Sequence, residues 1–197
     1  VNLGAPETMD PADDSRDYPV DKIVNKETGS VHEPASGNEG PLSFAFDKNN
    51  ETYYHSHWTA TTLDNLWVTM ELEEPAAIDG LRYLPRPASS GSHNGTMFGA
   101  KLQYSEDGKT WKDAGTATWP SPEDADYTRD WKLLQLAKPV TAKYFRLQAT
   151  ATYADGGRNN AFLSAAELRA AMASREILQS TALPSLITLE KICAALG

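Results

Sequence analysis

The chain has 197 residues, with 27 acidic and 18 basic side chains and a net charge of −9. This charge argues against nucleic acid as a partner, because phosphate binding needs clustered Lys and Arg, and it disfavours anionic membranes. A single cysteine, Cys193, excludes an internal disulfide, and no stretch approaches the ~20 apolar residues of a membrane span.

Residues 1–17 are polar, acidic and proline-bearing. This composition indicates a linker that follows a preceding domain. The chain begins without the positive and apolar regions of a signal peptide, so we expect that any secretion signal was removed or lay upstream.

From residue 18 to about residue 169, short runs of strand-forming residues alternate with turn signals, which predicts an antiparallel β-sandwich or barrel. A hairpin is expected where Asp107-Gly108 separates two such runs. The expected strands cover residues 66–72, 77–84, 100–105, 110–115, 131–136 and 143–150.

Residues 170–197 differ in character from the body of the chain. They are helix-prone, contain the cysteine and lack aromatic residues, and Pro184 should break or kink any continuous helix. We expect either an extension foreign to the domain or the start of a following helical region.

The stretch from Asp47 to Thr52 offers carboxylate, amide, hydroxyl and backbone oxygens within six residues. Calcium takes about six to eight oxygen ligands and suits such a compact loop, although the spacing is not that of an EF-hand. On local sequence alone, a solvated turn in which Asp47 bonds to nearby backbone is the simpler explanation.

His55 and His57 form a His-x-His pair, which on a strand would point both rings to one face. A zinc site needs at least a third ligand, and His32 and His93 lie in different loops, so the sequence disfavours zinc. We expect His55 to bond a ligand hydroxyl, with Trp58 either beside it as an apolar wall or packed in the core.

Later loops carry further groups suited to a polar ligand. Arg86 lies between two prolines, so its backbone is stiff and less entropy is lost on binding. Asn94 can both donate and accept hydrogen bonds, which suits a sugar hydroxyl. Phe162 follows a third polar loop and is either an aromatic at the loop tip or a core residue.

No arrangement of residues gives positive support for catalysis. Glycoside hydrolysis would need a paired acid and base, but the carboxylates cluster in linker and turn contexts. The sequence also lacks a Gly-x-Ser-x-Gly motif and a Cys/His pairing. We therefore expect a binding module and not an enzyme.

In this order, the motifs resemble the galactose-binding-like β-sandwich of the discoidin or F5/8 type C superfamily, and more narrowly family 32 carbohydrate-binding modules. The resemblance covers residues 20–169 and implies an all-β, antiparallel jelly-roll sandwich, here followed by the short helical tail. It rests on Ala45-Phe-Asp47 with Thr52 five residues on, the 104–111 hairpin, Lys143-Tyr-Phe-Arg146-Leu and Ser164-Ala-Ala-Glu167-Leu.

The resemblance implies a structural calcium ion held by the Asp loop and by the Ala-Glu pair of the final strand. The implied side-chain ligands are Asp47, Thr52 and Glu167, and the distant Glu167 supplies the carboxylate that the loop lacks. The implied backbone oxygens come from the region of Phe46, Asn50 and Ala166. Lys48 stands where the family usually has Gly, a departure that removes no ligand.

For the sugar, the resemblance implies a site made of His55, Trp58, Arg86, Asn94 and Phe162. Phe162 or Trp58 would pack on the apolar face of the ring, and the three polar side chains would bond its hydroxyls. The implied function is non-catalytic recognition of terminal galactose or N-acetylgalactosamine on host-type glycans, which targets a parent glycoside hydrolase to its substrate.

We expect a monomeric module of a bacterial protein that is secreted or attached to the cell surface. The competing hypothesis is a discoidin-type adhesion or membrane-surface-binding domain. Such domains usually have a disulfide between the ends of the sandwich and display apolar spikes, and neither is evident in the sequence.

Overall fold

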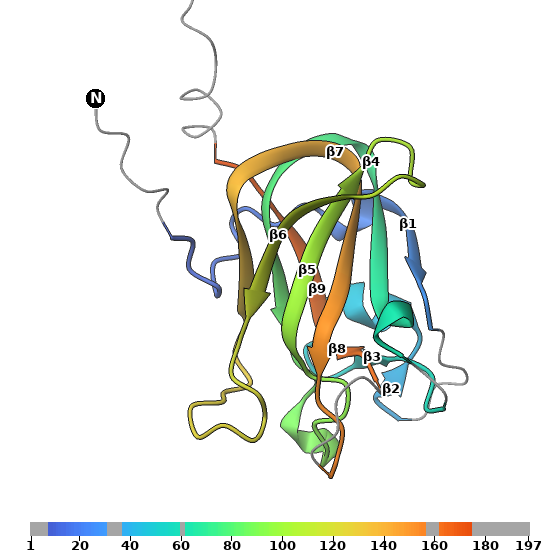
Figure 1. The fold of residues 1–197 in the computed structure, drawn as a ribbon, viewed down its shortest axis with the longest axis vertical. Coiled ribbons are helices and arrows are strands. Elements are labelled where there is room, and N and C mark those ends of the chain that lie inside the picture. The colour runs from blue at the N-terminus through green and yellow to red at the C-terminus, as the bar shows by residue number, and fades with distance from the viewer. Residues whose placement is uncertain (1–7, 31–36, 60–61, 157–161, 175–197) are drawn as a thin grey trace, which may run out of the picture.

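The computed structural model describes residues 8–30, 37–59, 62–156 and 162–174. Strands dominate these ranges, and all the helices in them are short 3₁₀ turns (Figure 1). None of these turns is long and apolar enough to cross a membrane. The expected all-β class is confirmed.

Two sheets make up the fold, and every strand pair is antiparallel except β2 with β3. The larger sheet has the order β1 (Ile23–Thr28), β4 (Trp67–Leu84), β7 (Lys132–Thr152), β5 (Met97–Ser105) and β6 (Lys112–Thr118), with β9 (Glu167–Met172) also paired to β4. The smaller sheet contains β2 (Glu39–Gly40), β3 (Tyr53–His55) and β8 (Ser164–Ala165). The 3₁₀ turns are η1 (Val20–Lys22), η2 (Leu42–Phe46), η3 (Leu63–Asn65) and η4 (Ala88–Ser90).

Strands β4 and β7 are long and bent, and β7 arches over the upper end of the sandwich in Figure 1. They pair along both halves, from Trp67 opposite Gln148 to Tyr83 opposite Lys132, with register shifts on either side of the bend. Pro75 lies at the first shift, as expected for a residue that cannot donate to the ladder. The sequence predicted two separate strands on either side of this proline, but the chain continues as one.

The core lies between the layers and follows the alternation of the strands. Val68, Met70 and Leu72 of β4 and Phe145 and Leu147 of β7 are fully buried. Burying one such side chain contributes roughly 1.5–3 kcal/mol. The same alternation decides which residues of β3 point away from the core.

The β5–β6 hairpin forms at the predicted turn. The Asp107 carboxylate accepts hydrogen bonds from the backbone N–H groups of Lys109 and Thr110, at 2.8 Å each. These bonds hold the pKa of Asp107 below its ordinary value. Gly108 has a φ of 71°, a conformation that favours glycine.

Residues 8–17 pack against the sandwich, so the expectation of a linker is wrong for this stretch. Met9 is buried, and Asp17 forms an ion pair with the buried Arg82 at 2.6 Å. Arg82 also donates to the carbonyl of Pro11. A buried guanidinium needs such acceptors, which explains why the polar segment stays on the fold.

The final strand runs to Met172, so helical character is wrong for Ala170 to Met172. Burial and pairing with β4 override the helix propensity of the alanines, because strand formation depends on tertiary packing. An isolated bridge from Asp17 to Ala171 joins the first and last described segments. The remainder of the expected helical tail, residues 175–197, lies outside the described residues.

Candidate functional site

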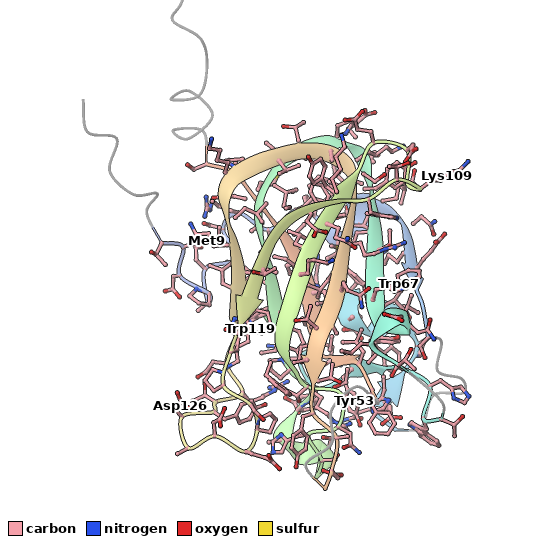
Figure 2. All side chains as sticks on the ribbon, in the orientation of Figure 1. Met9, Tyr53, Trp67, Lys109, Trp119 and Asp126 are labelled. Carbon is pink, nitrogen blue, oxygen red and sulfur yellow. The ribbon has the colours of Figure 1, made fainter. Side chains whose placement is uncertain are left out.

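Strand β3 sorts its three side chains by alternation. Tyr54 points into the core and donates its hydroxyl to the Ser30 carbonyl at 2.6 Å. Tyr53 and His55 therefore share the opposite face, where Tyr53 lies at the lower end of the sandwich (Figure 2). His55 pairs with Ser164 of β8, which brings the end of the chain's last polar loop beside it.

His55 and Phe162, which the resemblance assigns to one sugar site, lie side by side. Their ring centroids are 5.3 Å apart, and the rings are tilted by 49°. The Nδ1 atom of His55 lies 2.7 Å from the Ser56 carbonyl, which can only accept, so Nδ1 carries the proton. In the neutral ring the lone pair is then on Nε2. Phe162 is only partly buried, so it lies at the edge of the site and not in the core.

Arg86 is 5% exposed and uses three of its five N–H groups within the protein. Nε donates to the Ser90 hydroxyl, Nη1 to the Asn94 carbonyl at 3.0 Å, and Nη2 to the Tyr53 hydroxyl at 2.6 Å. Its guanidinium also lies over the Tyr53 ring, 4.3 Å from the centroid. Burial lowers the pKa of Arg86, and Tyr53 and Glu39 oppose this shift.

Asn94 reaches the site through its backbone as well as its side chain. Its carbonyl accepts from Arg86 and from the Ser164 hydroxyl, and its Oδ1 accepts from the Asp155 N–H. The side-chain Nδ2 is the group left to donate. Gly95 follows with a φ of 84°, and a Cβ there would lie 2.6 Å from the Ser164 nitrogen. Only glycine lets the two loops approach this closely.

Trp58 is 56% exposed, which excludes the core position that the sequence left open. Its Nε1 donates to Glu39 Oε1 at 2.8 Å, and the Tyr53 hydroxyl donates to Glu39 Oε2 at 3.0 Å. Arg86 Nη2 lies 3.9 Å from the same carboxylate. These four residues are here called the Glu39 network. The network links Trp58 to Arg86, two members of the predicted sugar site.

Sequence reasoning missed Glu39 and Tyr53. Glu39 is a lone acid in the two-residue strand β2, and no local pattern indicates a role for it. Tyr53 is two residues before His55, so the period-two rule for strands could have placed it on the same face. Burial raises the pKa of Tyr53 to about 12.

The Asp47–Thr52 stretch, here called the metal loop, forms a turn closed by its own side chains. Asp47 accepts from the Asn49 N–H at 2.8 Å and from the Thr52 hydroxyl at 2.6 Å. Lys48 has a φ of 63°, the left-handed conformation in which glycine is favoured. The glycine that the resemblance implies at this position would adopt this conformation without strain.

Glu167 is buried, 1% exposed, and neither carboxylate oxygen has a hydrogen-bond partner. Arg169 Nη1 lies 2.5 Å from Oε2 as an ion pair without hydrogen-bond alignment. Burial raises the pKa of Glu167, the charge of Asp47 adds to the rise, and Arg169 opposes it. A cavity of about 470 Å³ borders this carboxylate and is also lined by Lys48 and Asn50.

These residues fit a hard cation. A buried carboxylate with unpartnered oxygens, a second carboxylate near it and a hydroxyl are oxygen donors of the kind that calcium prefers. Among the described residues, no cluster of three His, Cys, Asp or Glu side chains could hold a metal, so backbone oxygens would have to complete the site. One of the expected backbone donors, the Asn50 carbonyl, accepts a hydrogen bond from Arg129.

The remaining expected backbone donors flank these side chains in sequence. Phe46 ends η2 immediately before Asp47, and Ala166 lies between β8 and β9 immediately before Glu167.

His57 is exposed and its Nδ1 accepts from the Thr59 N–H, whereas His55 is buried. His57 lies beyond the end of β3, so the two histidines do not share the strand face that a zinc pair would need.

Comparison with known proteins gives a consistent family. The sequence model of the F5/8 type C domain matches residues 26–168. The fold is similar to the Clostridium perfringens module CpGH89CBM32-5, solved in complex with GalNAc-β-1,3-galactose, at 29% identity and a TM-score of 0.58. That match covers 77% of this chain and 96% of the other.

Two further Clostridium perfringens structures share the fold at lower identity. CBM32-3 from a family 31 glycoside hydrolase has 24% identity and a TM-score of 0.64, over 80% of this chain and 96% of the other. The family 32 module of NanJ, in complex with galactose, has 20% identity and a TM-score of 0.57, over 77% and 95%.

Proposed function

The chain belongs to the F5/8 type C domain family, and on that premise we propose that it is a non-catalytic carbohydrate-binding module for terminal galactose or N-acetylgalactosamine. One observation carries the proposal. The His55 ring lies against Phe162 while Ser164, the strand partner of His55, shares the Asn94 carbonyl with Arg86. Apolar and hydrogen-bonding surfaces thus meet at one end of the sandwich, as sugar recognition requires.

In the proposed complex, Phe162 packs on the apolar face of the sugar that an axial O4 leaves. His55, Asn94 Nδ2 and the remaining N–H groups of Arg86 bond the hydroxyls O3, O4 and O6. Trp58 forms an exposed wall, oriented by Glu39. Each exchanged hydrogen bond contributes only about 1 kcal/mol net. We therefore expect weak binding, roughly −4 to −6 kcal/mol, which corresponds to high-micromolar to millimolar Kd.

Calorimetric titration with galactose, N-acetylgalactosamine and lactose tests the proposal, with glucose as the epimer that lacks axial O4. We expect His55→Ala and Arg86→Ala to abolish measurable binding. His57→Ala is the matched control, because His57 is a neighbouring but exposed histidine. A wild-type protein that binds no galacto-configured sugar would refute the proposal. Binding to anionic vesicles instead would favour the adhesion hypothesis.

We also propose that the metal loop binds structural calcium through Asp47, Thr52 and Glu167, with backbone oxygens of Phe46, Asn50 and Ala166. The support is the buried, unpartnered carboxylate of Glu167 near Asp47. Bound calcium would add a second positive charge beside the one that Arg169 supplies to Glu167. The ion would tie the loop to the final strand, and no step of sugar binding needs it directly.

The wider role is part of the same proposal. CpGH89CBM32-5 and the family 31 hydrolase module come from Clostridium perfringens, and the latter belongs to a glycoside hydrolase by description. We propose that this module likewise targets a parent glycoside hydrolase, as a monomeric unit of a bacterial protein that is secreted or attached to the cell surface. Binding of host-type glycans by the parent protein, reduced when the module is deleted, would support this role.

A further inference from the structure

One side chain joins the metal loop to the segment that carries Arg86. Arg129 follows β6 in the loop that leads to β7, and its Nε donates to the carbonyls of Pro85 and Arg86 at 3.1 and 3.3 Å. Its Nη2 donates to the Asn50 carbonyl in the metal loop. A single guanidinium thus bridges two stretches that are far apart in the sequence.

The hydrogen bonds of Arg129 go to backbone carbonyls and not to side chains. The Arg129 ion pair with Glu51 is long, 3.9 Å, and both side chains are partly exposed, at 26% and 61%. Such an exposed pair contributes little. The bonds to carbonyls are charge-assisted and directional, because the planar guanidinium presents its donors in a fixed fork. They fix where the backbone of residues 85 and 86 lies relative to the metal loop.

A second, weaker link runs parallel to the first. The Ser89 hydroxyl in η4 donates to Glu51 Oε2 at 3.3 Å. η4 begins two residues after Arg86 and contains Ser90, whose hydroxyl accepts from Arg86 Nε. The metal loop is therefore linked to residues 85–90 twice, through Arg129 at residues 85 and 86 and through Glu51 at Ser89.

We propose that Arg129 is a positioning residue that couples the conformation of the metal loop to the placement of Arg86. This inference rests on the proposed function for its effect on sugar binding, but the coupling itself concerns only this chain's residues. The Asn50 carbonyl has two lone pairs, so it can accept from Arg129 and face a cation at once. A change in the loop then moves the carbonyl that Arg129 holds, and through Arg129 the backbone of Arg86.

The test is the ¹H–¹⁵N resonance of the Arg86 Nε–H group, measured in wild type and in Arg129→Gln. We expect calcium addition, and separately the substitution Asp47→Asn, to shift this resonance in wild type and not in Arg129→Gln. Arg129→Lys keeps the charge but has one donor nitrogen, so it should lose the coupling as well. Arg16→Gln is the matched control, since it removes an arginine whose ion pair is with Asp79 of β4 and not with either loop.

Galactose titration adds a second reading. We expect Arg129→Gln to weaken binding about fivefold in calcium and to remove the difference between calcium and chelator that wild type shows. An Arg86 resonance that responds equally in wild type and Arg129→Gln would overturn the coupling. So would a wild-type resonance that neither calcium nor Asp47→Asn moves. If wild type binds no galactose, the proposed function fails, and the resonance alone decides the coupling.

Discussion

The Glu39 network and the metal loop solve the burial of charge in opposite ways. In the network, the buried Arg86 donates to three protein acceptors, and Glu39 accepts from two donors. Beside the metal loop, the buried Glu167 has two oxygens without a hydrogen-bond partner and one unaligned cation. In the Glu39 network, protein groups supply the hydrogen bonds of the charged side chains, whereas beside the metal loop they supply none to Glu167.

The difference indicates which ligand stabilises the fold and which binds to a site that is already formed. A satisfied polar network holds its geometry without the ligand, so little ordering is needed on binding. The Glu167 carboxylate has an ion pair but no hydrogen bond, so a second cation would lower the cost of burying it. We therefore expect calcium to act mainly on stability, and sugar to bind a site that is already formed.

The largest effect is expected for Glu167→Gln. In wild type, calcium at about 100 times its Kd should raise the free energy of unfolding by roughly 2.7 kcal/mol. The variant should lose most of this gain, because the amide cannot replace the charged ligand. Without calcium it should be less stable than wild type, because the amide no longer compensates the charge of the buried Arg169. Urea unfolding in calcium and in chelator measures both values.

The matched control for this variant is Glu106→Gln, an exposed glutamate whose side chain is 82% accessible. It should keep the full response to calcium. If Glu167→Gln is stabilised by calcium as strongly as wild type, the metal loop is not the calcium site, and the contrast between the two regions loses its explanation.

The next effect is expected for Tyr53→Phe, which breaks the complete network. Its hydroxyl both accepts from Arg86 and donates to Glu39, so its loss removes one hydrogen bond from each of these charged groups. We expect a loss of about 1.5 kcal/mol in unfolding free energy and weaker galactose binding. Tyr54→Phe is the matched control, because it should cost stability in the core without changing galactose affinity. Equal affinity losses in both variants would contradict a specific role for the network.

The sequence predicted the class of fold and named Trp58 and Arg86 of the Glu39 network as site candidates, but not how each residue is used. His55, Phe162, Asp47, Thr52 and Glu167 could be named because a strand, a turn and a family motif mark them. That Arg86 acts through the Asn94 backbone could not be predicted, because a carbonyl's direction depends on tertiary structure. Long-range partners such as Glu39 leave no local pattern at all.

The bends of β4 and β7 and the packing of residues 8–17 were missed for a related reason. Pro75 is a valid turn signal, yet it occupies a bulge in a strand that continues. The acidic segment before residue 18 has the composition of a linker, but the buried Arg82 needs its carbonyls and Asp17. Composition reports local preference, whereas the partners that the tertiary structure brings together decide whether a segment packs or pairs.

A smaller effect is expected for Trp58→Phe. The variant keeps an aromatic wall but removes the Nε1–H group that donates to Glu39. Because Trp58 is exposed, we expect little change in stability and a two- to threefold loss of galactose affinity, about 0.5 kcal/mol, by calorimetry. Trp58→Ala, which also removes the wall, should lose more. Equal losses in the two variants would show that the ring itself contributes nothing.

The smallest effect is expected from alkaline pH, which tests whether the network stays intact. Burial raises the pKa of Tyr53 to about 12, above the ordinary 10.0, so the folded state binds the phenolic proton more tightly than the unfolded state. The stability that this provides is fully present below pH 10 and is lost as pH rises through 12. Galactose affinity should therefore be nearly constant up to about pH 11. Absorbance of tyrosinate at about 295 nm, with the Tyr53→Phe titration subtracted from that of wild type, isolates this group. A difference that titrates near pH 10 would mean that the Tyr53 phenol is open to water and that the Glu39 network is not closed.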